Sequence, residues 1–236
     1  MRASDLLCHD ILTRLIAFDT TSRNSNLEMI AWIQDYLAGF NIATELTYDD
    51  DQRKANLFAT LGPAENSGGI ILSGHTDVVP IDGQDWVTDP FEMTEKDGKL
   101  YGRGTSDMKS GVAAFVVAAI KLARELETGP GMVLIITAGE ETGCEGAYHL
   151  AGLGNVLGDA GAIVVAEPSS NLPFIGHKGA LWLKAVASGL TAHGSMPELG
   201  VNAIYKAART ISQLEDFDFN VARHPVLGKP TLNVVT

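Results

Sequence analysis

The sequence predicts an α/β protein with a mostly parallel sheet flanked by helices. Short apolar runs alternate along the chain with longer stretches of helical spacing, the arrangement expected of strand–helix–strand units. Several of these runs are apolar throughout, which is typical of strands buried on both faces. Acidic or histidine-bearing signatures follow the runs, at the sheet edge where such folds bind ligands.

The helices are predicted from apolar residues that recur every three to four positions. In the first of them Leu7, Ile11 and Leu15 share one face, and the second ends at Gly39, a favoured helix-terminating residue. The four helices expected before residue 179 run over Leu6–Phe18, Asn26–Leu37, Met108–Glu127 and Gly146–Leu153.

The strands are predicted from short β-branched or alternating runs. The first alternates like a half-buried strand, and the later ones are continuously apolar. The five runs are Ile42–Tyr48, Asn56–Leu61, Ile70–Ser73, Met132–Thr137 and Ala162–Ala166. A long polar excursion, Pro80–Lys99, contains turn signals such as Asp97-Gly98.

The pattern changes near residue 179, which divides the chain into residues 1–178 and 179–236. The later part contains an alternating run at Ala180–Ala187, an amphipathic helix at Asn202–Leu214 and the start of a strand at Leu232–Val235. A strand, a helix and half a hairpin cannot bury a core of their own. We therefore expect the first half of a small α+β domain.

Composition restricts the partners. The chain has 236 residues and a formal net charge of −12, which disfavours nucleic acid and anionic membranes. No apolar run reaches the roughly 18 residues of a membrane span, and we see no signal-peptide pattern. Two cysteines, Cys8 and Cys144, suit a reducing compartment, so we expect a cytoplasmic protein.

Four signatures carry candidate chemistry, because each lies just after an apolar run or at a helix start. They contain His75 with Asp77, Asp107, the pair Glu140-Glu141, and Glu167. One histidine with several carboxylates suits zinc, with cobalt or manganese as alternatives. At the carboxyl ends of neighbouring strands they would form a two-metal hydrolytic site.

Each signature also has a simpler interpretation. His75 could be a turn histidine with Asp77 as a capping residue, or it could bind metal while Asp77 accepts a hydrogen bond from its other ring nitrogen. Asp107 could be a helix N-cap or a carboxylate that bridges two cations.

The remaining acids are equally open when taken alone. Glu140 and Glu141 could form a solvated acidic turn, and Glu167 could be an exposed strand end. Lys109 is expected to be a solvated charge or an outer partner of the site rather than a base, and Cys144 a small packing residue. The order of the four signatures favours the metal site.

The signatures resemble the dinuclear metallo-amidohydrolases, which include acetylornithine deacetylase, succinyl-diaminopimelate desuccinylase, aminoacylase and glutamate carboxypeptidase. The matching strings are Gly74-His75-Thr76-Asp77-Val78-Val79-Pro80, Tyr101-Gly102-Arg103-Gly104-Thr105-Ser106-Asp107-Met108-Lys109, Glu140-Glu141, Ala166-Glu167-Pro168 and Ala192-His193-Gly194-Ser195-Met196-Pro197. They occur in the family's order and cover nearly the whole chain.

The resemblance implies a role for each residue. His75 and Glu167 would bind one zinc ion, Asp107 would bridge to a second, and Glu141 would bind that second ion. The catalytic residues would be Glu140 as general base and then acid, Asp77 as the residue that orients His75, and His193 as a contact to the substrate carbonyl oxygen.

The resemblance also implies a function, the hydrolysis of the amide bond of an N-acyl amino acid. Asp89 in the string Asp85-Trp86-Val87-Thr88-Asp89-Pro90-Phe91 favours an acetylornithine deacetylase over a desuccinylase. A metallo-aminoacylase or carboxypeptidase is the nearest alternative. The small domain would serve as a dimerisation or lid domain, with a homodimer formed by the full-length protein.

Family members continue past the position of Thr236 and supply a further histidine ligand from that later part. We therefore expect a C-terminally truncated chain with an incomplete second metal site and impaired activity. The alternative from another functional class is an inactive fragment that binds metal or dimerises.

Overall fold

The structure is a computed structural model that describes residues 3–63, 68–154 and 157–235. The chain divides into two compact units, Met1–Ser170 and Asn171–Thr236. The first unit contains all the strands of the main sheet and four of the helices.

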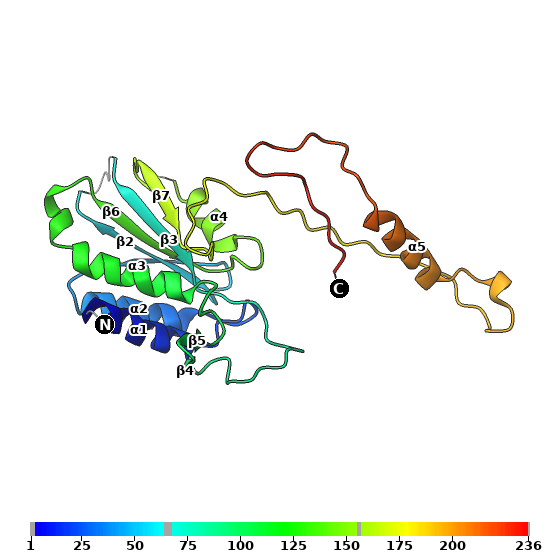
Figure 1. Cartoon of the computed structure of the whole chain (residues 1–236), viewed down its shortest axis with the longest axis horizontal. Coiled ribbons are helices and arrows are strands. Elements are labelled where there is room, and N and C mark those ends of the chain that lie inside the picture. Colours follow the sequence, from blue (N-terminus) through cyan, green and yellow to red (C-terminus); the bar gives the residue numbers. More distant parts are fainter. Residues whose placement is uncertain (1–2, 64–67, 155–156, 236) are drawn as a thin grey trace. The chain divides into compact units, whose positions relative to one another are not determined.

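The first unit is built on a five-stranded sheet with the strand order β1-β2-β6-β3-β7 (Figure 1). The bounds are Glu45–Tyr48 for β1, Ala55–Leu61 for β2, Ile70–His75 for β3, Met132–Thr137 for β6 and Ala162–Val165 for β7. The predicted α/β class is confirmed, and the sheet is mixed. Strands β6, β3 and β7 are parallel, whereas β2 runs antiparallel to both β1 and β6.

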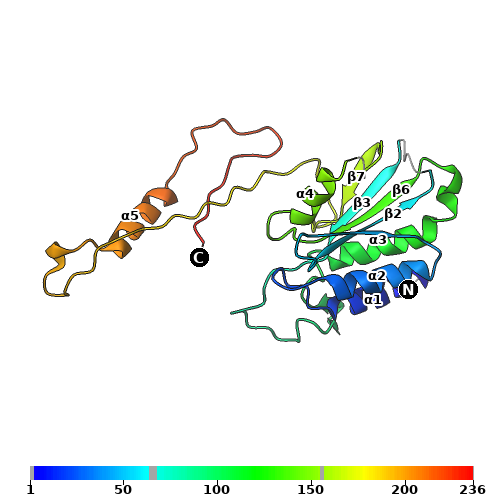
Figure 2. The same cartoon turned by 180° about the vertical axis from the view of Figure 1, so that it is seen from behind.

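Helices cover both faces of this sheet (Figure 2). Three helices lie on one face: α1 (Ala3–Ile16), α2 (Leu27–Ala38) and α3 (Lys109–Leu122). The fourth helix, α4 (Glu145–Gly152), places Leu150 against the opposite face. The helix predicted over Met108–Glu127 is shorter than expected: α3 ends at Leu122, and a short 3₁₀ helix follows at Glu125–Thr128.

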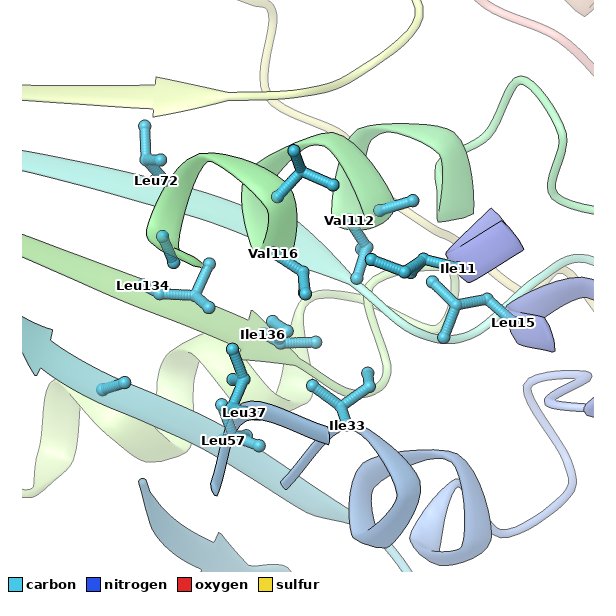
Figure 3. Packing of buried hydrophobic residues seen from close by; sticks show 14 of the residues in the cluster. Ile11, Leu15, Ile33, Leu37, Leu57, Leu72, Val112, Val116, Leu134 and Ile136 are labelled. Atoms are coloured by element: carbon cyan, nitrogen blue, oxygen red, sulfur yellow. The ribbon is translucent and has the colours of Figure 1, made fainter. Parts of the chain in front are cut away.

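The core explains why the central strand β6 is buried at every position and apolar from Met132 to Ile136. In β6, Leu134 and Ile136 pack with α1, α2 and α3 (Figure 3), whereas Val133 and Ile135 belong to the smaller cluster around α4. Successive side chains of a strand point to opposite faces, so a strand covered on both sides has no solvent-facing position.

The polar excursion between β3 and α3 contains a small hairpin that the sequence pattern missed. Its strands are β4 (Thr94–Lys96) and β5 (Lys99–Tyr101). The predicted turn lies between them, with φ of 53° at Asp97 and 68° at Gly98. Two consecutive positive φ angles favour Asp-Gly in a two-residue hairpin loop.

The second unit has one regular helix, α5 (Ala203–Glu215), which confirms the predicted amphipathic helix. Asn202 caps it, because its side-chain oxygen accepts hydrogen bonds from the amides of Ile204 and Tyr205 at 2.8 and 3.1 Å. The strands predicted at residues 180–187 and 232–235 are absent from the described part of this unit. Alternating side chains form a strand only when a neighbouring strand pairs with the backbone, and residues 180–187 are exposed.

No helix in the described ranges is long and apolar enough to cross a membrane.

Candidate metal centre

The candidate residues of the first unit gather at one edge of the sheet. His75 is the last residue of β3, the pair Glu140-Glu141 follows β6, and Glu167 follows β7. Because these three strands are parallel, their carboxyl ends meet at the same edge. Asp107 lies in the turn before α3, and the peptide bond between Asp107 and Met108 is cis.

His75 lies at the centre of the cluster and is only 2% exposed. Its Nε2 atom lies 3.3 Å from Asp107 Oδ1, 3.5 Å from Glu167 Oε1 and 3.9 Å from Glu140 Oε2. Although buried, this nitrogen has no hydrogen-bond partner among the described residues. A buried polar atom without a partner costs free energy, so the arrangement is suited to a ligand at Nε2.

The other ring nitrogen of His75 is held by the backbone. Nδ1 lies 2.9 Å from the carbonyl oxygen of Asp77 and 3.5 Å from its carboxylate Oδ1. The expected carboxylate contact is therefore secondary to a main-chain one. An Nδ1–H donated to this carbonyl leaves Nε2 as the ligating atom of the neutral ring.

The Asp77 carboxylate has a second set of contacts that sequence reasoning did not foresee. One oxygen accepts a hydrogen bond from the Glu140 amide and the other from the Glu141 amide, each at 3.1 Å. Asp77 is 3% exposed, so both bonds are shielded from water. The same side chain thus links the histidine segment to the backbone of the acidic pair.

A buried network of hydrogen bonds holds the backbone next to His75 in place. The side-chain nitrogen Nδ2 of Asn26 donates to the Ala55 carbonyl at 2.8 Å and to the Thr76 hydroxyl at 2.9 Å. The Thr76 hydroxyl donates to the Thr137 carbonyl, and the Thr20 hydroxyl donates to the Thr76 carbonyl at 2.6 Å. In the sequence Asn26 predicted only a helix start, because its partners are distant in the chain.

Lys109 is fully buried, which corrects the expectation of a solvated charge. Its Nζ donates to the carbonyls of Leu15 and Phe18 at 3.0 and 2.7 Å, at the end of α1. Carbonyls at a helix end lack intrahelical partners and attract a cation. Burial lowers the pKa of Lys109 to about 7.

The acids of the cluster fall into two groups by the direction in which their pKa values are shifted. Burial opposes a charge on His75, but the carboxylates of Asp77 and Glu167, each 3.5 Å from a ring nitrogen, outweigh burial and raise its pKa to about 11. The pKa of Glu167 is lowered, chiefly by the close approach of its carboxylate to His75 Nε2. The pKa of Asp77 is also lowered, because His75 and the two amides outweigh the effect of burial.

The other three carboxyl groups are harder to ionise. Burial, followed by repulsion from Asp107, raises the pKa of Glu141 to about 7. The pKa values of Glu140 and Asp107 are raised by burial and then by the Glu167 charge. Clustered carboxylates that repel one another are stabilised by a shared cation.

The geometry fits a divalent metal. Nitrogen and oxygen ligands about 2.0–2.1 Å from a tetrahedral zinc ion lie roughly 3.3–3.4 Å apart. The distances from His75 Nε2 to Asp107 and Glu167, 3.3 and 3.5 Å, are close to that spacing. Two overlapping sets have ligand atoms within 4.8 Å of one another: His75, Asp107 and Glu141, and His75, Glu140 and Glu167.

The two remaining candidate residues lie in different units. His193 lies in the second unit, where its Nδ1 lies 2.8 Å from the Ser195 hydroxyl. Cys144, expected as a packing residue, is half-buried, and its sulfur lies 3.9 Å from Glu140 Oε1.

Comparisons with known proteins identify the family. Residues 71–220 match the family described as Peptidase family M20/M25/M40. The chain is 38% identical over 208 residues to a probable succinyl-diaminopimelate desuccinylase of Staphylococcus epidermidis, covering 86% of this chain and 50% of that protein. It is also 38% identical over 223 residues to the acetylornithine deacetylase of Proteus mirabilis, covering 92% of this chain and 56% of that protein.

A solved structure shows the same fold. The M20 family metallo-carboxypeptidase Sso-CP2 of Sulfolobus solfataricus matches with a TM-score of 0.67 and 17% identity, covering 91% of this chain and 50% of that one. The chain spans about half the length of the curated relatives it matches. The sequence match extends over the strands and loops that carry His75, Asp107, Glu140, Glu141 and Glu167. The chain belongs to Peptidase family M20/M25/M40.

Proposed function

We propose that this chain supplies the metal centre of a hydrolase that cleaves the amide bond of an N-acyl amino acid. The observation that carries the proposal is the buried Nε2 of His75, which faces the carboxylates of Asp107 and Glu167 at ligand spacing. Membership of a peptidase family supports amide hydrolysis as the reaction class.

In this proposal zinc is the metal, with cobalt or manganese as substitutes. His75, Asp107 and Glu167 would hold one ion, and Asp107 and Glu141 would hold the second. Glu141 suits a metal ligand because burial, followed by repulsion from Asp107, raises its pKa, and a shared cation relieves that repulsion. When bound, such ions polarise a carbonyl group and lower the pKa of water to roughly 7.

Glu140 acts as the proton carrier. It takes a proton from the attacking water and later donates it to the leaving amine, a role typically worth ~10²–10⁴-fold in rate. Its raised pKa, caused by burial and then by the Glu167 charge, brings the carboxyl group closer to the working pH of such a base. Asp77 holds the backbone of Glu140 and the ring of His75 in register.

The substrate is proposed to be an N-acetyl amino acid of the acetylornithine type. Asp89-Pro90-Phe91 favours this choice, and a relative of Proteus mirabilis carries that name. A desuccinylase is the second candidate, favoured by the relatives of Staphylococcus species named probable succinyl-diaminopimelate desuccinylase. The contact of His193 with substrate, a homodimer of the complete protein and a cytoplasmic location belong to the same proposal.

Zinc titration and amine release test the proposal together. The chain is freed of metal by a chelator, titrated with zinc against a competing dye, and incubated with N-acetylornithine or N-succinyl-diaminopimelate. We expect zinc to bind, and His75→Ala and Glu167→Ala to abolish tight binding. Unchanged zinc uptake in both variants would overturn the metal assignment.

Turnover separates hydrolysis from metal binding alone. In any form that releases the amine, Glu140→Gln should abolish release while zinc stays bound. Loss of zinc instead would exchange the roles of Glu140 and Glu141. Zinc binding without amine release from either substrate favours the non-catalytic alternative for this chain.

A further inference from the structure

Asn56 is a buried polar side chain that the proposed mechanism does not use. It lies in β2 and is 3% exposed. Its Oδ1 accepts a hydrogen bond from the Ala138 amide at 3.0 Å, and its Nδ2 donates to the Gly146 carbonyl at 3.2 Å. Nδ2 also donates to the Thr47 hydroxyl at 3.1 Å.

These contacts join the two ends of one loop. Residues 138–146 run from the end of β6 into the first turn of α4 and carry Glu140 and Glu141 between their ends. The ends also bond each other directly, because the Gly146 amide donates to the Ala138 carbonyl at 2.9 Å. Asn56 therefore closes the loop from the sheet side, eighty or more positions away in the sequence.

Asn56 packs tightly against Gly146 in α4. A Cβ atom added to Gly146 would collide with Asn56 Oδ1 and with the Ala138 carbonyl oxygen. The helix α4 can approach the side chain this closely only because residue 146 is glycine. An amide with an acceptor and two donors satisfied in a packed site has one orientation.

The middle of the same loop is held from the opposite side. Both oxygens of Asp77 accept backbone hydrogen bonds there, from the amides of Glu140 and Glu141. Two buried side chains thus hold a short loop at its ends and at its centre. The loop carries one proposed metal ligand and the proposed proton carrier.

We infer that Asn56 is a positioning residue for Glu140 and Glu141, acting through the backbone of the loop at residues 138–146. The inference rests on the proposed metal site. Partners that orient metal ligands without touching the metal typically change affinity 10–100-fold when replaced. A side chain that only stabilised the fold would change stability without a specific effect on the metal.

The test compares Asn56→Leu with Leu57→Ala. Leu57 is the next residue of β2, is 0% exposed and packs in the main hydrophobic cluster. Both variants should lower the stability of the fold. Only Asn56→Leu should weaken zinc binding, by about 10–100-fold in chelator competition, with both proteins shown to be folded by circular dichroism.

A double-mutant cycle that combines Asn56→Leu with Glu141→Ala tests whether Asn56 acts on zinc affinity through Glu141. If Asn56 acts by placing Glu141, the loss in zinc affinity caused by Asn56→Leu shrinks to within about twofold when Glu141 is already absent. The loss in unfolding free energy should be the same in both backgrounds. Asn56→Asp keeps the acceptor for Ala138 but loses the donor to Gly146, so it serves as the milder variant if Asn56→Leu does not fold.

The outcomes are distinct. Equal zinc affinity in Asn56→Leu, or in Asn56→Asp where that is the folded variant, overturns the inference and leaves the proposed function standing. An equal loss of affinity in Leu57→Ala also overturns it, because instability alone would then explain the effect. Absence of zinc binding by the unaltered chain overturns both.

Discussion

The two ring nitrogens of His75 lie in different environments, and this difference defines the candidate site. Nδ1 is fixed by a main-chain carbonyl at 2.9 Å, whereas Nε2 faces three carboxylates and lacks a hydrogen-bond partner among the described residues. The sequence showed that a histidine and acids follow neighbouring strands. It could not show that the Asp77 carboxylate bonds the Glu140 and Glu141 amides, because those bonds join residues more than sixty positions apart.

Metal uptake should release protons. His75, with a pKa of about 11, carries a proton at pH 7, and Glu141, with a pKa of about 7, carries about half of one. Ligands must lose these protons, so we expect more than one proton released when both sites fill. Calorimetry in buffers of different ionisation enthalpy measures the number.

The same protons set the pH dependence of metal affinity. Zinc affinity should fall as the pH drops through 7, where Glu141 becomes fully protonated, and should keep rising above it because His75 still holds its proton. An affinity that does not vary between pH 6 and 8 would contradict this assignment of ligands.

Lys109 predicts a pH-dependent stability of the fold. Its pKa is about 7 when folded and 10.5 for a free side chain, so the unfolded chain binds more protons between these limits. The cost of burying the charge is complete below pH 7 and disappears as the pH rises through 10.5. Between pH 7 and 10.5, the free energy of unfolding of the wild-type chain should therefore rise relative to that of Lys109→Met by up to about 1.4 kcal/mol per pH unit.

Urea unfolding at several pH values measures this difference. Lys121→Met, in the last turn of the same helix and exposed, is the matched control and should show no such slope. A parallel pH dependence for the wild-type chain and Lys109→Met would show that Lys109 stays charged in the fold.

At the scale of elements, the edge strand and the central strand of the parallel part differ in burial. Leu134 in β6 is 0% exposed, whereas Val164 in β7 is 43% exposed. Continuous apolar runs predicted both strands equally well. Only the sheet order shows that β6 lies between two strands and β7 lies at the edge.

This difference predicts unequal costs for truncating the two side chains. Leu134→Ala should destabilise the fold by about 2–5 kcal/mol, because it leaves a cavity between the sheet and the helices. Val164→Ala should cost less than about 1 kcal/mol, because the side chain is already in contact with water. Urea midpoints measure both, and a similar loss in the two variants would contradict the exposure found for β7.

At the scale of the whole molecule, the two units differ in what holds them together. The first unit contains both hydrophobic clusters, and all the residues proposed to bind metal lie within it. The second unit contributes α5, whose Ile204 and Ile211 are exposed, together with His193. The sequence placed the division at residues 178 and 179, where the strand–helix alternation stops, and the compact units meet at Ser170 and Asn171.

We expect a fragment ending at Ser170 to fold and to bind zinc with an affinity within about threefold of the whole chain. The reason is that the core clusters and the five clustered side chains are all contained in it. Circular dichroism and chelator competition on the two proteins check this. Much weaker zinc binding by the folded fragment would show that the second unit contributes to the metal centre.

The sequence by itself determined the α/β class, the position of most helices and strands, and the residues that meet at the sheet edge. These features follow from local periodicity and from the fact that parallel strands end on the same side. Tertiary structure alone decided the mixed sheet order, the burial of Lys109, and the roles of Asn26 and Asn56, because those depend on partners distant in the chain. It also decided against strands at residues 180–187 and 232–235, since a strand requires a paired neighbour that local pattern cannot supply.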